Sequence, residues 1–127
     1  MKKILLDTNF LLIPYQFNVD IFSEIDRIML EKYQLFVLDK TIDELKKITK
    51  DEKQKLKNRN AAKLALQLIK AKKVKILKTK QDLPVDGLIV KLKGYIVATQ
   101  DIGLKKRLKG KKTQIITLRA KKTLIFD

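Results

Sequence analysis

Short apolar runs separated by amphipathic segments recur along the whole chain. Most of these runs are continuous stretches of branched or aromatic residues, which is typical of strands buried on both faces rather than on one. Five strands are predicted, with one further short run near the end of the chain: Ile4–Leu6, Leu35–Leu38, Val74–Leu77, Tyr95–Ala98, Gln114–Leu118 and Leu124–Phe126. Strands of this kind favour a parallel sheet covered by helices on its two sides.

Helical spacing of apolar residues occupies the segments between these runs. Asp20 is a good N-cap for a helix in which the apolar residues of positions 21–29 share one face. Further helices are predicted at residues 41–48, 51–72, 88–93 and 102–108. No repeat, linker or low-complexity tract divides the chain. The pattern therefore predicts one α/β domain over residues 1–127, with a central parallel sheet of about five strands flanked by helices.

The net charge of the chain indicates the kind of partner that it binds. The chain carries 30 Lys and Arg against 14 Asp and Glu, a formal charge of +16. So large an excess favours a polyanionic partner, because each neutralised phosphate releases counterions. A lysine-rich proteome would also give basic surfaces, but it usually supplies matching glutamate, and glutamate is scarce here.

The residue types that are missing narrow the chemistry. The chain has no cysteine and no histidine, which excludes disulfides, the usual zinc sites and a histidine general base. Any metal must be held by oxygen ligands, which suit Mg²⁺, Mn²⁺ or Ca²⁺. The apolar stretch 4–13 is interrupted by Asp7, Thr8 and Asn9, so we expect no membrane span, no membrane partner and a cytoplasmic location.

Four carboxylates lie where a parallel sheet would present a site. Asp7 closes the first strand, Glu44 follows the second, Asp86 heads a helix and Asp101 follows the fourth strand. Ligands of open parallel sheets bind outside the carboxyl ends of the strands. If the strand order brings these ends together, the four negative charges repel each other unless divalent cations neutralise them. Such ions can bridge a phosphate and activate a water.

Each acid except Asp7 also has an ordinary structural interpretation. Thr41 and Glu44 have the spacing of a capping box, in which the glutamate only satisfies the start of its own helix. Asp86 and Asp101 have positions suited to N-caps. Asp7, at the exit of a buried strand, has no comparable alternative, so the set as a whole carries the hypothesis.

At these residues the sequence resembles the PIN-domain family, and especially its archaeal branch of Fcf1-like ribosomal RNA processing nucleases. The start Ile-Leu-Leu-Asp-Thr-Asn and the later block Val-Ala-Thr-x-Asp are similar to the family's motifs. Five segments resemble the family in its own order: 4–9, 38–45, 85–90, 95–108 and 116–122.

The resemblance implies a Rossmann-like sheet and an endonuclease that acts on single-stranded RNA. It implies a catalytic metal site for Mg²⁺ or Mn²⁺ built from four acids, Asp7, Glu44, Asp86 and Asp101. Thr99 is expected as a polar neighbour in the pocket, and Asn9 as a residue that orients Asp7 or a metal-bound water.

Two departures from the family pattern follow Asp86. Many relatives carry a second Asp directly after this acid, where this chain has Gly87. The interval from Asp86 to Asp101 is also about one helical turn shorter than usual, so a displaced Asp86 would weaken one metal site.

Basic residues are concentrated after Asp101, where they could lead a phosphate backbone towards the acids. The predicted RNA-binding residues are Lys105, Lys106, Arg107, Lys109, Lys111, Lys112, Arg119, Lys121 and Lys122. Residues 53–59 could supply a second wall. The same lysines would equally serve as solvated helix faces, and contacts to phosphate position an RNA without specifying its sequence.

The leading hypothesis is a metal-dependent single-strand endoribonuclease that processes ribosomal or other structured RNA. A ribonuclease toxin of the VapC type, acting with an antitoxin, would use the same acids. A catalytically weak RNA-binding or ribosome-assembly module is the alternative that Gly87 and the short interval favour. Because PIN-like domains often pair, a homodimer is a further expectation.

Overall fold

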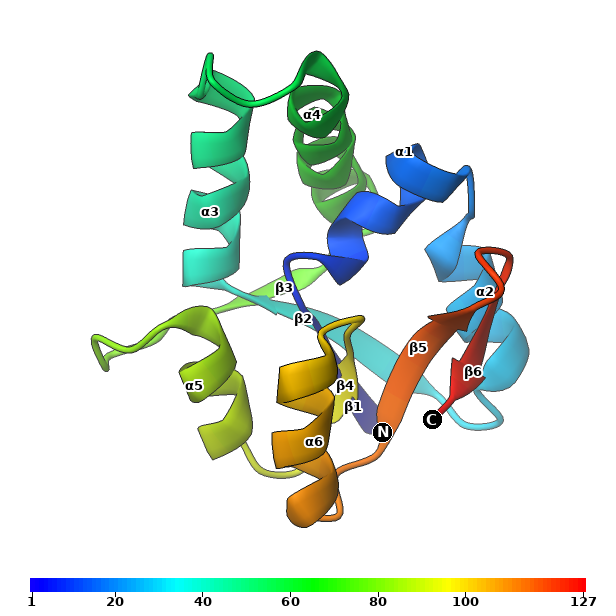
Figure 1. Ribbon diagram of the computed structural model, residues 1–127. Coiled ribbons are helices and arrows are strands. Elements are labelled where there is room, and N and C mark those ends of the chain that lie inside the picture. Colours follow the sequence, from blue (N-terminus) through cyan, green and yellow to red (C-terminus); the bar gives the residue numbers. More distant parts are fainter.

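Six strands form one sheet in the computed structural model, which describes residues 1–127 (Figure 1). The strand order is β3-β2-β1-β4-β5-β6. The strands are β1 (Lys2–Leu6), β2 (Tyr33–Leu38), β3 (Lys75–Leu77), β4 (Ile96–Ala98), β5 (Ile115–Arg119) and β6 (Thr123–Phe126). Strands β1 to β5 pair in parallel, and β6 pairs antiparallel with β5. The predicted α/β domain with a parallel sheet of about five strands is confirmed, with an antiparallel sixth strand at one edge.

The five predicted helices are present but differ at their ends, and two further helical segments within residues 10–17, which were not predicted, precede them. They are η1 (Phe10–Leu12, a 3-10 turn), α1 (Ile13–Phe17), α2 (Ile21–Ile28), α3 (Asp39–Lys50), α4 (Leu56–Ala71), α5 (Val85–Lys91) and α6 (Ile102–Gly110). The helix predicted from residue 51 begins five residues later, because the Asp51 side chain accepts a hydrogen bond from the Lys53 amide and holds a turn there. None of the helices is both long and apolar enough to span a membrane.

The two faces of the sheet are covered unequally, as Figure 1 shows. Side chains alternate along each strand, so that Ile4 and Leu6 face a core of 22 buried residues shared with α1 to α4, whereas Leu5 faces a core of eight shared with α5 and α6. Burial of one such side chain stabilises the fold by roughly 1.5–3 kcal/mol. The stability of the face covered by α5 and α6 therefore depends on few buried residues.

The edge strand β6 is attached to α2 by side chains rather than by another strand. The Glu24 carboxylate accepts a hydrogen bond from the Leu124 amide (3.0 Å), and Arg27 donates one to the Leu124 carbonyl (3.0 Å). Asp20 caps the same helix by accepting from the Phe22 and Ser23 amides, as predicted. Both polar groups of one edge residue are thus satisfied, which limits further strand pairing there.

Candidate active site

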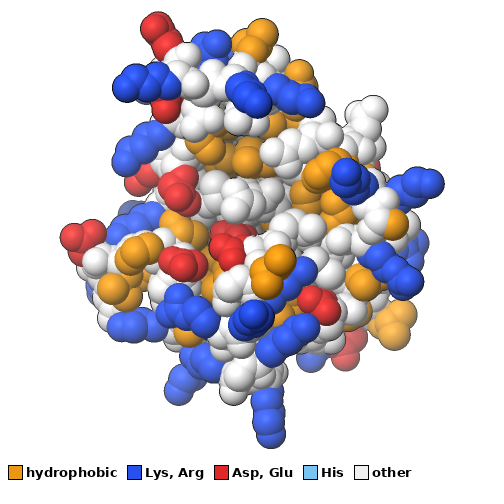
Figure 2. Space-filling view, in the orientation of Figure 1, with side chains coloured by type: hydrophobic (Ala, Val, Ile, Leu, Met, Phe, Trp, Pro, Cys, Tyr) orange, Lys and Arg blue, Asp and Glu red, His pale blue; other side chains and the backbone are white.

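All four acids singled out by the sequence line one pocket at the carboxyl ends of the strands. The pocket has a volume of about 180 Å³, and its walls include Asp7, Glu44, Asp86 and Asp101. The strand order explains this convergence, since β1 lies beside β4 and the Asp7 amide donates to the Ala98 carbonyl (3.0 Å). Figure 2 shows acidic side chains gathered on this face of the molecule, with lysine and arginine around them.

Asp7 is the buried member of the set, with 7% of its surface exposed. One carboxylate oxygen accepts from the Thr8 amide (2.8 Å) and the other from the Thr99 hydroxyl (2.8 Å). Burial raises the pKa of Asp7 above its usual value, against the lowering effect of these two hydrogen bonds. The negative charges of Asp101 and Glu44 raise that pKa further. The pocket therefore holds a carboxylate whose charge is poorly compensated by the protein itself.

Glu44 is tied to the end of β1 instead of to its own helix. Its carboxylate accepts a hydrogen bond from the Thr8 hydroxyl (2.7 Å). The capping-box interpretation is wrong, because α3 begins at Asp39 and Thr41 is a buried residue inside the helix. Thr8 and Thr41 also approach each other through their hydroxyls (3.3 Å). The glutamate is exposed and lines the pocket.

Asp101 caps α6 and faces the pocket at the same time. Its Oδ1 accepts from the Leu104 amide (3.1 Å), so the N-cap interpretation is confirmed. Its own amide donates to the Thr99 hydroxyl (3.1 Å). A Cβ at Gly103 would lie 3.3 Å from Asp101 Oδ1, so the glycine leaves room for the capping carboxylate. Oδ2 is not used in the cap.

Asp86 is the loosely held member of the set. It lies in the first turn of α5, where Pro84 is the N-cap, so its own N-cap interpretation is wrong. Its Oδ1 accepts from the Gly87 amide (2.9 Å), and its Oδ2 lies 3.6 Å from Arg107 Nη1. A Cβ at Gly87 would meet only Leu83, at an ordinary 3.8 Å. The fold therefore has room at position 87 for the additional acid that many relatives carry.

The donor set has the chemistry of a site for a hard divalent cation, although no three of its carboxylates converge closely enough to hold one as they stand. Each carboxylate accepts a hydrogen bond from the protein. The set is entirely oxygen, with three exposed carboxylates around a buried one, and such ligands suit Mg²⁺ or Mn²⁺. Asn9 is exposed on the same pocket wall.

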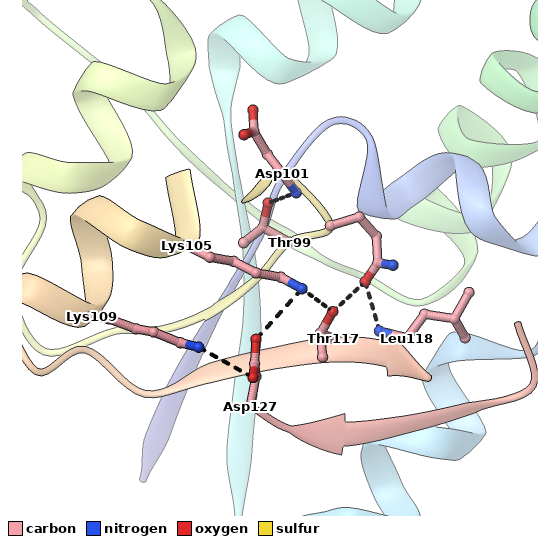
Figure 3. A network of polar contacts seen from close by, with 8 residues as sticks. Thr99, Asp101, Lys105, Lys109, Thr117, Leu118 and Asp127 are labelled. Carbon is pink, nitrogen blue, oxygen red and sulfur yellow. Dashed lines mark hydrogen bonds and ion pairs between the residues drawn. The ribbon is translucent and has the colours of Figure 1, made fainter. Parts of the chain in front are cut away.

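A network of polar side chains fixes the loop that carries Asp101 (Figure 3). Gln100 Oε1 accepts from the Thr117 hydroxyl (2.7 Å) and from the Leu118 amide (2.6 Å). Lys105 donates to the same Thr117 hydroxyl (2.6 Å) and pairs with Asp127 at 3.5 Å. These contacts attach the loop after β4 to β5, so the position of Asp101 depends on the neighbouring strand.

Sequence reasoning assigned no role to Thr8, Gln100 or Thr117. Thr8 and Thr117 are buried polar residues, and buried polar groups need hydrogen-bond partners. The positions of Thr8 and Gln100 directly beside Asp7 and Asp101 were the available signal, whereas Thr117, in the middle of β5, had none. The partners themselves come from distant segments and leave no local pattern.

The structure divides the predicted RNA-binding residues among three places. Lys105, Lys106, Arg107 and Lys109 lie along α6; Lys111 and Lys112 follow its far end; Arg119, Lys121 and Lys122 lie at the β5–β6 turn. Arg107 faces Asp86, and Lys105 and Lys109 pair with Asp127. Lys111 and Lys112 do not line the acidic pocket but a separate groove.

Comparison with known proteins agrees with this architecture. Residues 4–121 match the model of a family described as a PIN like domain. The chain is 31% identical over 123 residues to Ribonuclease VapC4 of Methanocaldococcus jannaschii, covering 96% of this chain and 94% of that protein. The structure of the PIN domain endonuclease Utp24 superposes with a TM-score of 0.79 at 24% identity, covering 98% of this chain and 90% of that one. A domain of a functionally unknown protein from M. jannaschii gives a TM-score of 0.59 at 15% identity, covering 94% of this chain and 93% of its own.

Proposed function

The chain belongs to the PIN-like domain family, and from this membership and its pocket of carboxylates we propose that it is a divalent-metal-dependent endoribonuclease that cleaves single-stranded RNA. The observation that carries the proposal is the surroundings of Asp7, a buried carboxylate whose pKa is raised by burial and by two neighbouring acids. A fold tolerates such repulsion where the charge is needed for function. The name of the relative VapC4 supports RNA as the substrate.

The four acids Asp7, Glu44, Asp86 and Asp101 would hold Mg²⁺ or Mn²⁺. A divalent cation supplies charge neutralisation at the scissile phosphate and lowers the pKa of an attacking water. Thr99 and the Thr8 amide hold Asp7 in one orientation, and their hydrogen bonds favour its ionised form. Asn9, on the pocket wall, is suited to orient a polar group of the substrate or a water.

Cations on α6 lie beside the pocket and suit the approach of an RNA backbone. Lys106 is exposed, and Arg107 reaches the pocket through Asp86. These contacts position a phosphate chain without reading its bases.

For the biological role, we favour processing of ribosomal or other structured RNA, because the Fcf1-like motifs and the charge of +16 fit a large polyanionic substrate. A VapC-type ribonuclease toxin is the second candidate, favoured by the 31% identity to VapC4. A catalytically weak RNA-binding module remains the alternative that Gly87 and the exposed Asp86 favour. The first two candidates share metal-dependent RNA cleavage, whereas the third binds RNA with little or no cleavage.

The deciding experiment is cleavage of an end-labelled single-stranded RNA in Mn²⁺. The wild type is compared with Asp7→Asn and Asp101→Asn, and with Asp43→Asn as a matched control at an exposed acid outside the pocket. We expect cutting that requires Mn²⁺, survives in the control and is lost in both pocket variants. Cutting that persists in Asp7→Asn contradicts the assigned site. A wild type that binds the RNA without cutting it supports the RNA-binding module.

A further inference from the structure

A second concave surface lies at the amino ends of the strands, at the other end of the sheet from the carboxylates. This basal groove has a volume of about 620 Å³. Five of its twelve lining residues are lysines, Lys2, Lys3, Lys93, Lys111 and Lys112, and none is acidic. The whole chain has 30 basic and 14 acidic residues among 127, so the groove is richer in lysine and poorer in acids than the chain as a whole.

The fold brings these lysines together from three distant segments. Lys2 and Lys3 begin β1, Lys93 precedes β4, and Lys111 and Lys112 follow the end of α6. Strands β1 and β4 are neighbours, and α6 returns the chain to the start of β5. Figure 2 shows lysine and arginine projecting from the lower part of the molecule, where Figure 1 places the end of α6.

The groove and the acidic pocket are separated by the length of one strand. From Lys2 in the groove to Asp7 in the pocket the chain advances five residues along β1, which corresponds to about 16 Å at 3.3 Å per residue. Helix α6 has nine residues, or about 13 Å. A ligand held in the groove therefore leaves the carboxylates free, and an RNA that occupies both must be longer than the few nucleotides at the pocket.

Two of the five lysines have no protein partner. Lys2 lies 3.7 Å from Glu31, Lys3 is 4.6 Å from the centre of the Tyr95 ring, and Lys111 donates to a backbone carbonyl. Lys93 and Lys112 are exposed and make no such contact. They are the side chains whose charge is most available to an anion.

We propose that the basal groove is a second RNA-binding site, which holds backbone phosphates of a long RNA whose scissile bond lies in the acidic pocket. Ammonium groups bind phosphate as point charges and release counterions on doing so. The groove is concave, which suits a phosphate chain better than a flat lipid surface. Lys3 covers the ring of Tyr95, so the site offers little base stacking and little sequence preference. The role in cleavage rests on the proposed function, whereas the binding does not.

The test measures RNA binding in EDTA, where no metal-dependent cutting occurs. Fluorescence anisotropy of a labelled 30-nucleotide single-stranded RNA is recorded over a range of KCl concentrations. The wild type is compared with Lys93→Glu/Lys112→Glu and with Lys63→Glu/Lys70→Glu, a charge-matched pair on α4 away from both sites. Thermal melting and circular dichroism check that each variant is folded. If the Lys93→Glu/Lys112→Glu variant melts at a lower temperature than the wild type, Lys93→Gln/Lys112→Gln is used in its place.

We expect the groove variant to bind at least about tenfold more weakly in low salt. Its plot of log affinity against log salt should be less steep by about 1.4, because each single-strand phosphate contact contributes about 0.7. The α4 variant should change affinity less than about threefold, since it alters only the long-range field. Equal losses in both variants, or an unchanged slope, would overturn the proposal. If the groove variant binds RNA as tightly as the wild type but no longer binds vesicles containing phosphatidylserine, the groove is a membrane-binding site and the proposal is overturned too.

A cleavage assay separates this proposal from the nuclease proposal. In Mn²⁺ the groove variant should cut a hexanucleotide at the wild-type rate and a 30-nucleotide RNA about tenfold more slowly at subsaturating enzyme. If the wild type cuts neither RNA, the nuclease fails while the binding result stands. If the groove variant cuts both RNAs normally, the coupling of groove and pocket fails while the nuclease stands.

Discussion

Asp7 and Asp86 line the same pocket but are held in opposite ways. Asp7 follows the central strand, is buried, and receives a hydrogen bond on each oxygen. Asp86 lies on the seven-residue helix α5, with half of its side chain exposed, and pairs with Arg107 at 3.6 Å. An exposed ion pair of this kind contributes about 0–1 kcal/mol. The sheet therefore fixes one carboxylate before any ligand arrives, whereas the other is free to adjust.

The largest expected difference is in cleavage. Asp7→Asn should lower the single-turnover rate in Mn²⁺ by about a thousandfold, because it removes a preorganised charge from the centre of the site. Asp86→Asn should cost roughly 10- to 100-fold, since an exposed and mobile ligand contributes less. Rates measured at saturating enzyme distinguish the two. Equal losses would mean that Asp86 is as essential as Asp7 and would break the comparison.

A smaller loss of activity is expected when Thr99, whose hydroxyl donates a hydrogen bond to Asp7, is replaced. Thr99→Val keeps the volume of the side chain but removes both the hydrogen bond to Asp7 and the acceptor for the Asp101 amide. We expect a loss of roughly 10- to 100-fold in Mn²⁺ affinity or cleavage, as for other groups that orient metal ligands. Thr99→Ser should retain most of the activity because it keeps the hydroxyl. A Mn²⁺ titration of cleavage measures both, and an active Thr99→Val would show that burial alone orients Asp7.

The smallest effect is on stability, and its sign opposes the effect on activity. The folded-state pKa of Asp7 is raised, so the folded protein binds this proton more tightly than the unfolded chain, and stability is lost as the pH rises from the ordinary value towards the raised one. At pH 7 without divalent ions, Asp7→Asn should therefore melt about 2–4 °C higher than the wild type, as for other functional residues held at a cost in stability.

Two conditions sharpen this stability test. The advantage of Asp7→Asn should shrink as the pH falls below the raised pKa and should also shrink in Mn²⁺, which stabilises only a protein that binds it. Asp86→Asn should show no comparable gain, because its carboxylate is exposed. Differential scanning calorimetry measures these shifts. A wild type that melts above Asp7→Asn without metal would contradict the proposed repulsion.

The sequence was most informative about features that the backbone topology determines. Asp7 and Asp101 follow strands that the apolar pattern marks clearly, and in a parallel sheet such ends share one edge. The partner of Glu44 was not predictable in the same way. Its contact with Thr8 depends on how α3 packs over the end of β1, and the local capping pattern of Thr41 favoured a different partner.

The basic residues show a second limit of sequence reasoning. Lys106 and Lys112 are close in sequence and suggested one surface leading to the acids. A helix advances by 1.5 Å per residue, so α6 begins at the pocket, where Asp101 is its N-cap, and ends near the basal groove, where Lys112 follows it. Charge excess was visible in the sequence, but its division between two ends of the sheet required the strand order.

The central place of β1 also sets the order in which the molecule can fold. On one side β1 pairs with β2, which is synthesised soon after it, and on the other side with β4, which follows β3, α4 and α5. Chains emerge at about 5–20 residues per second, so one edge of β1 stays unpaired until the later strand arrives. The hydrogen bond from the Asp7 amide to the Ala98 carbonyl cannot form until Ala98 has been synthesised, and Asp101 follows three residues later. A nascent chain therefore cannot assemble its carboxylate pocket until most of the protein has been made.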